Sequence, residues 1–119
     1  MTLLTSLVLA AFYLTQAVPL NTLQPANIGC KALTDLLQVV DTHVKFGRDA
    51  AVSLWKEKID EKKCINTGDT SFQVKVIELV HDVDIPAEGV TIEVYKTEFS
   101  DGTPWYVPVF IKLKKRPEA

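Results

Sequence analysis

Residues 30–64 read CKALTDLLQVVDTHVKFGRDAAVSLWKEKIDEKKC and decide how the rest of the chain can fold. Apolar residues recur in the first half of this stretch at alternating steps of three and four, the spacing of an amphipathic helix with one buried face. Gly47 suits the residue just past the end of that helix, and Asp49 suits the start of a second one. We therefore predict two helices, over 30–44 and 49–63.

The two cysteines of the chain stand at the ends of this stretch. One continuous helix would hold Cys30 and Cys64 about 50 Å apart, whereas a disulfide requires Cα atoms within about 7 Å of each other. A reversal at Gly47, which is equally far from both cysteines, removes the conflict. The sequence therefore predicts a helical hairpin closed by a Cys30–Cys64 disulfide. If the cysteines pair between two chains instead, one long helix becomes possible again.

After the second cysteine the apolar pattern changes to a period of two, which is typical of β-strands. The alternation predicts three strands, over 72–79, 90–95 and 105–113. The stretch 81–89 is expected to be a loop and 100–104 a turn, because both are rich in Asp, Gly and Pro. The predicted fold class is α+β, with the disulfide-stapled helical hairpin followed by a three-stranded antiparallel β-meander.

Two details of the strand pattern carry further expectations. The inward-facing phase slips near Val76 and Ile77, and one extra residue in a β-bulge would explain the slip. Pro108 lies inside the last strand, and a proline without an N–H group is expected at a sheet edge or a bulge.

The start of the chain predicts its compartment. Residues 3–14 read LLTSLVLAAFYL, an uncharged run that is too short for a transmembrane helix of about 20 residues but fits the apolar region of a signal peptide. Thr15 and Ala17 are small enough for signal peptidase, so we predict cleavage after Ala17 and a secreted protein. The alternative is a buried N-terminal helix.

The predicted domain organisation has three parts. Residues 1–17 form the signal peptide, residues 18–29 form an extended N-terminal segment with space for one edge strand, and residues 30–119 form a single α+β domain. A chain of this length is near the usual size of one domain. The formal net charge of −2 at pH 7 gives no reason to expect nucleic acid as a partner, and no later run is apolar enough to span a membrane.

No pattern typical of enzyme chemistry is present. The chain has no G-x-S-x-G, HExxH or Walker sequence, and both cysteines are expected in the disulfide. The acidic stretch around His81, Asp82 and Asp84 supplies oxygen atoms that suit Ca²⁺, but its spacing is not that of an EF-hand. We therefore predict no enzyme activity, no metal and no cofactor.

The favoured function is that of a small secreted binding protein, such as a toxin, effector, inhibitor or signalling ligand, that contacts an extracellular protein through loops of the sheet. Aromatic side chains exposed at loop tips are good anchors for partners, and Trp105 follows Pro104 at the last turn. The alternative for Trp105 is an inward side chain that opens the last strand. The candidate partner-binding residues are Pro104, Trp105, Tyr106, His81, Asp82 and Asp84.

A second hypothesis is an extracellular carrier of a small hydrophobic ligand. Apolar residues make up 47% of the chain, and ligand pockets are mostly apolar with few polar groups. The pocket would lie between the helical hairpin and the sheet, lined by Leu33, Leu37, Val40 and Trp55.

Three features resemble the secreted cystatins, which inhibit papain-like proteases. These are the signal peptide before a single small domain, Gly29 just ahead of the helical region, and the Pro104–Trp105 pair in the last hairpin. The resemblance implies a helix packed across an antiparallel sheet and a third hypothesis, a protease inhibitor that inserts these residues into the protease cleft. The chain departs from the family because it lacks the Q-x-V-x-G hairpin and the disulfide-rich C-terminal half, and because its helical region is longer.

Overall fold

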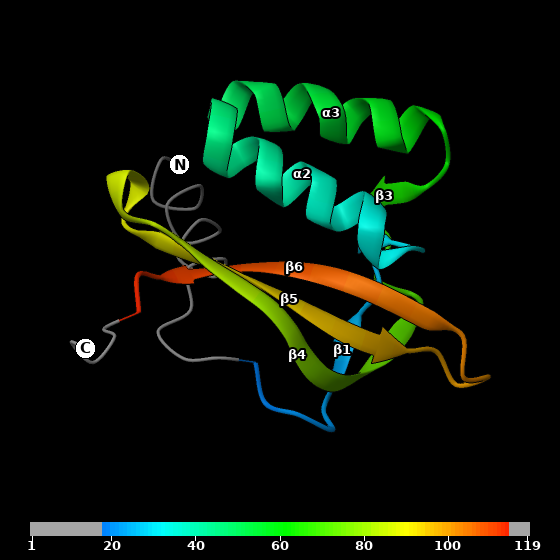
Figure 1. Cartoon of the computed structure of the whole chain (residues 1–119). Helices are drawn as coiled ribbons and strands as arrows, with labels where there is room; N and C mark the ends of the chain where they lie inside the picture. Colours follow the sequence, from blue (N-terminus) through cyan, green and yellow to red (C-terminus); the bar gives the residue numbers. More distant parts are fainter. Residues whose placement is uncertain (1–17, 115–119) are drawn as a thin grey trace, which may run out of the picture.

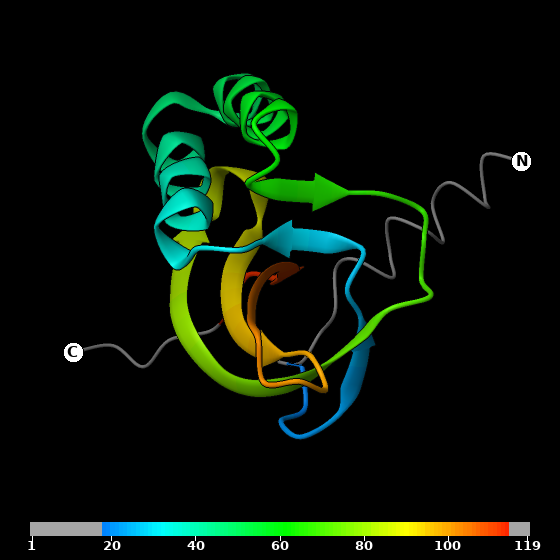
Figure 2. The same cartoon turned by 90° about the vertical axis from the view of Figure 1, so that its right-hand side faces the viewer.

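A six-stranded antiparallel sheet and two helices make up the fold. The structure is a computed structural model that describes residues 18–114. The helices lie side by side over one face of the sheet (Figure 1), and Figure 2 shows that the sheet curls into an open half-barrel. The predicted signal peptide, 1–17, and the last residues, 115–119, lie outside the described residues.

The strands that neighbour one another in the sheet are not in chain order. From one edge to the other the order is β1-β4-β5-β6-β2-β3. Along the chain, the elements are β1 (Leu23–Pro25), β2 (Ile28–Cys30), α2 (Leu33–Phe46), α3 (Arg48–Asp60), β3 (Cys64–Asn66), β4 (Gln73–Ile85), the 3-10 turn η1 (Pro86–Glu88), β5 (Val90–Glu98) and β6 (Pro104–Lys112).

The predicted three-stranded sheet is wrong. β4, β5 and β6 do form a meander, but β1 pairs with β4, and the β2–β3 ribbon pairs with β6. β1, β2 and β3 have three residues each, which is too short for a period-two pattern to be recognised. The prolines at the start of the chain remain compatible with the short β1, because β1 is an edge strand of the sheet.

The helical hairpin is confirmed. The chain reverses at Gly47, whose φ of 93° lies in the range that favours glycine, and the Gly47 N–H donates a hydrogen bond to the carbonyl oxygen of His43 at 3.0 Å. The Ala51 N–H then donates to the Gly47 carbonyl oxygen at 3.2 Å, so the second helix begins directly after the glycine and before the predicted Asp49. Both helices are shorter at their outer ends than predicted, because the cysteines lie in strands.

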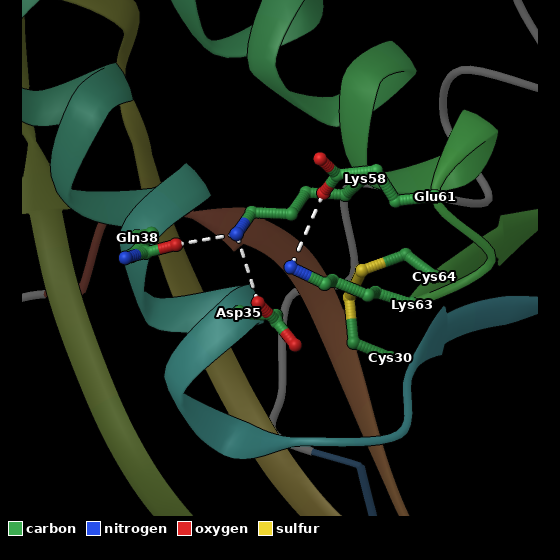
Figure 3. The surroundings of a disulfide bond; sticks show 7 residues. All are labelled: Cys30, Asp35, Gln38, Lys58, Glu61, Lys63 and Cys64. Carbon is green, nitrogen blue, oxygen red and sulfur yellow. Dashed lines mark hydrogen bonds and ion pairs between the residues drawn. A yellow bond between two sulfur atoms is a disulfide. The ribbon is translucent and has the colours of Figure 1, made fainter.

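The disulfide within the chain is confirmed, and it joins two paired strands. Cys30 in β2 lies directly opposite Cys64 in β3, their Cα atoms are 4.0 Å apart, and both side chains are buried. Figure 3 shows the buried Lys58 of α3 reaching across to α2, where its Nζ donates to Asp35 Oδ1 at 2.8 Å and to Gln38 Oε1. The ends of the helical hairpin are therefore held by one covalent bond and one buried ion pair.

The predicted loop over 81–89 is wrong in its first half. β4 continues to Ile85, and only residues 86–89 turn. The predicted bulge is confirmed by a shift in the β4–β5 register between Val76 and Glu78, and a second shift follows between Leu79 and His81. Two shifts so close together interrupt the alternation of apolar residues, which is why the strand looks like a loop in the sequence.

β5 lies in the centre of the sheet and is buried on both faces. Alternate residues point to opposite faces of a strand, so Val90, Ile92 and Val94 face the helices, where they join the main core with Leu36 and Val40. The residues at the odd-numbered positions of β5 face the inside of the curl. Those buried on that inner face are Thr91, Glu93, Tyr95 and Thr97.

Candidate functional site

A partly open cavity of about 530 Å³ lies between the helical hairpin and β6 and extends onto the inner face of the sheet. The helices line it with Val40, Ala51 and Trp55, and β6 lines it with Val107 and Phe110. Apolar side chains make up most of the surface. The cavity volume falls within the range of about 300–1,000 Å³ that is typical of pockets for small molecules.

The cavity exists because β6 has little pairing on the side toward β2. In the described part of the chain, β2 meets β6 at one position, where Cys30 lies opposite Tyr106. Beyond this point the β2 side of β6 has no strand beside it over residues 18–114, and the helices cross above the gap (Figure 1). Pro108 lies in this part of β6, as expected for a residue that has no N–H group to donate.

Two cationic or titratable side chains line the helical part of the cavity. Arg48, the first residue of α3, is exposed, whereas His43 of α2 is only 6% exposed. His43 Nε2 lies 2.7 Å from Glu88 Oε2, which ties α2 to the turn η1, and the His43 ring packs 6.1 Å from the ring centre of Phe110. Among the cavity-lining residues that are described, none is Asp or Glu.

A buried polar cluster borders the cavity on the inner face of β5. Tyr95 lines the cavity, and its hydroxyl donates a hydrogen bond to Glu93 Oε1 at 2.7 Å. Glu93 is 0% exposed, and its Oε2 pairs at 2.6 Å with Lys114 Nζ, which also contacts Asp82 Oδ2 at 2.8 Å. The backbone N–H of Val18 donates to the Tyr95 hydroxyl at 3.1 Å. The cluster thus ties the start of the described chain to the segment after β6.

The surroundings of the cluster fix the protonation states of Tyr95 and Lys114. Burial raises the pKa of Tyr95 above its ordinary value, and the hydrogen bond to the Glu93 carboxylate raises it further, so the phenol stays neutral. The contacts with Asp82 and then with Glu93 raise the pKa of Lys114, so the amine stays charged. The phenol of Tyr95 therefore stays neutral and the amine of Lys114 stays charged, as expected for a cluster with a structural role.

Two orientations of the Trp105 side chain were considered from the sequence, exposed and inward, and the structure has the inward one. The indole is 5% exposed and packs in a second small core with Ala26, Val74 and Phe99. Its neighbour Pro104 is exposed and Tyr106 is half-buried. Because the indole is buried, the exposed surface of this turn consists of residues 100–104.

The candidate partner-binding residues come from the predicted loop 81–89 and from the predicted turn 100–104 with the start of the strand after it, and the turns observed in these two regions lie at opposite ends of β5. The turn 86–89 precedes this strand and the turn 100–103 follows it. At about 3.3 Å per residue, a strand of nine residues separates its ends by nearly 30 Å. Figure 1 shows the two turns at the left and right ends of the sheet.

The predicted acidic group is also divided between faces. His81, Asp82 and Asp84 lie in β4, where they pair with Val94, Glu93 and Thr91 of β5. The two aspartates share the inner face, where Asp84 Oδ1 accepts a hydrogen bond from the Thr91 hydroxyl at 2.8 Å.

His81 lies on the helix-facing side of β4, away from the two aspartates, and is exposed. Within residues 18–114 no group of three His, Cys, Asp or Glu residues is placed to hold a metal ion.

The comparisons add no relative from which a function could be transferred. No family model matches the chain, and neither a curated protein nor a solved structure shows a significant similarity to it. In the part of the chain that the structure describes, no helix has the length and apolar character needed to cross a membrane. The function must therefore be argued from the cavity and its surroundings.

Proposed function

We propose that the protein is an extracellular carrier that binds a small apolar ligand in the cavity between the helical hairpin and β6. The cavity is the observation that carries the proposal, because its volume of about 530 Å³ and its apolar lining match what small-molecule pockets require. Val40 and Trp55 line it, as the carrier hypothesis expects. Leu33 and Leu37, which the same hypothesis places in the lining, do not line the cavity and pack against the main core of the domain.

The other two hypotheses receive less support from the geometry. A protein partner held by both turns would have to span the length of β5. A cystatin-like wedge would need Gly29 and Trp105 to be accessible, and both are buried. Gly29 packs against the Trp105 ring in the interior.

The charges around the cavity favour an amphiphile with a carboxylate head and an apolar tail, such as a medium-chain fatty acid. Arg48 is the permanent charge in the described lining, and no carboxylate there opposes it. Its exposure places the guanidinium where a ligand head would remain partly in water. A guanidinium can bind both carboxylate oxygens at once, whereas the apolar walls receive the tail.

The first test fills the cavity. The change Val109→Phe adds a ring at a half-buried lining position, so we expect it to weaken the binding of dodecanoate about tenfold or more, which corresponds to ~1.4 kcal/mol. Isothermal titration calorimetry of the secreted protein with dodecanoate measures the affinity.

Val44→Phe is the matched control, because Val44 is exposed on α2 and does not line the cavity. Both variants should melt within a few degrees of the unchanged protein. If the unchanged protein binds neither dodecanoate nor dodecanol, or if both variants bind equally well, the carrier proposal is wrong.

The second test concerns the head group. We expect Arg48→Gln to weaken dodecanoate binding by up to about fivefold, because an exposed ion pair contributes ~0.2–1 kcal/mol, and to leave dodecanol binding unchanged. The effect should shrink at high salt, since salt screens exposed charges. Titrations of both ligands at low and high ionic strength measure it.

Lys56→Gln is the control for the second test. Lys56 is exposed on the same helix but does not line the cavity, so this variant should bind both ligands like the unchanged protein. An equal loss of dodecanoate and dodecanol affinity in Arg48→Gln would show that Arg48 does not recognise the head group.

A further inference from the structure

The buried carboxylate of Glu93 shares its cation with a second carboxylate. Glu93 is fully buried, and Lys114 Nζ pairs with it at 2.6 Å while also contacting Asp82 at 2.8 Å. The other oxygen of Glu93 accepts a hydrogen bond from the Tyr95 hydroxyl at 2.7 Å. A buried carboxylate in such surroundings gains strongly from a further positive charge.

The nitrogen of Val18 is placed to supply that charge. Val18 N lies 3.1 Å from the Tyr95 hydroxyl oxygen, although the two residues are 77 positions apart in the chain. The hydroxyl therefore accepts from Val18 and donates to Glu93. The bond between Ala17 and Val18 is also the predicted signal-peptide cleavage site, because small residues precede it.

The geometry points to Val18 as a processed N-terminus whose new ammonium group docks on Tyr95 and balances the buried Glu93. Hydrolysis of the Ala17–Val18 peptide bond consumes one water, leaves a carboxylate on Ala17 and an amine on Val18, and the amine takes up a proton at neutral pH. A peptide N–H offers one neutral donor, whereas the ammonium offers three donors and a full charge. The inference rests on the predicted cleavage site and not on the proposed ligand.

The docked N-terminus has a consequence for the cavity. Val18 lines the cavity together with Tyr95, so the processed end of the chain completes part of its wall. Cleavage would thus both release the protein for secretion and fix the site in its final form.

The test compares three versions of the protein that differ at this end. One begins at Val18, one begins at Ala17, and one begins at Val18 with an acetylated amine. The first should melt higher than the other two by roughly 5 °C at pH 6, since it alone places an ammonium on Tyr95. Intact mass of the secreted protein checks that the natural chain begins at Val18.

The pH dependence gives the signature of a charged N-terminus. The titratable and charged groups near Val18 are Tyr95, which it contacts, and the groups linked to Tyr95 in the cluster, namely Glu93 on β5, Asp82 on β4 and Lys114 after β6. Carboxylate neighbours raise the pKa of an amine in the folded state. The extra stability is therefore fully present below the unfolded pKa of about 8 and is lost as the pH rises through the folded value.

A second pair of variants separates docking from a merely structural role of the first residue. In Glu93→Gln, or in Tyr95→Phe if the first variant does not fold, the chains that begin at Val18 and Ala17 should melt at the same temperature. The inference is overturned if the natural chain begins elsewhere. Equal melting of the Val18 and Ala17 chains, or a difference that survives both substitutions, also overturns it.

Discussion

Replacing Cys30 and Cys64 by alanine is expected to lower the free energy of unfolding by about 4 kcal/mol. The bond closes a loop between residues 34 positions apart, and the loss of loop-closure entropy in the unfolded chain gives a value of this size. Stabilities of natural domains lie at about 5–15 kcal/mol, so the loss of the bond removes a large share of the net stability. Urea unfolding followed by circular dichroism measures the difference.

Reduction of the unchanged protein provides the control for this experiment. It breaks the covalent bond but leaves both buried sulfur atoms in place, so it isolates the effect of the cross-link from the effect of lost packing. Its cost should approach that of the double variant. A loss below about 1 kcal/mol in both cases would mean that the buried Lys58–Asp35 contact already holds the helical hairpin closed.

The change Gly29→Ala is expected to cost about 3 kcal/mol or more, through two effects that add. Gly29 has a φ of 153°, a backbone conformation that L side chains rarely adopt. A Cβ at this position would lie 2.6 Å from Trp105 Nε1 and closer still to the backbone oxygen of Tyr106. That oxygen belongs to the position where β6 meets β2, so it cannot retreat without opening the sheet.

Two other glycines separate these effects. Gly102→Ala shares a positive φ, at 86°, but has open space around the added Cβ, so it should cost about 1 kcal/mol. Gly68→Ala has open space and no positive φ, so it should leave the stability nearly unchanged. Gly29→Ala should lower the melting temperature most, Gly102→Ala less, and Gly68→Ala least. Equal losses at Gly29 and Gly102 would exclude the steric contribution.

The helical hairpin could be predicted because its signals are local. The spacing of apolar residues on each side of Gly47 reports helical periodicity directly, and the reach of a disulfide excludes a single straight helix within one chain. The positive φ of Gly47 is the structural counterpart of this signal.

The extent of the sheet could not be predicted, because its missing parts depend on distant partners. β1 pairs with β4 across a gap of nearly fifty residues, and β2 meets β6 at Tyr106 far along the chain. Segments of three residues have no pattern of their own. The two register shifts in β4 also hide a long strand from any test for regular alternation.

The buried charged and titratable groups could not be predicted for a related reason. A sequence pattern assigns Glu, Lys and His to water, and Lys58, Glu93 and His43 are buried because each has a partner from another element. Glu93 and Lys114 are on different segments, and nothing in either segment indicates the other. The cavity follows from the same long-range geometry, because it depends on how much of β6 the β2–β3 ribbon covers.

The central place of β5 determines which parts of the protein can open without the rest. Every residue from Val90 to Glu98 is paired on both sides, with β4 and with β6, and the strand is buried on both faces. Its amide protons can therefore reach solvent only when the whole domain unfolds, whereas the three residues of β1 can fray alone. The amide protons of the cavity wall formed by β5 are thus the last in the protein to exchange with solvent. The edge strands of the sheet can open while that wall keeps its shape.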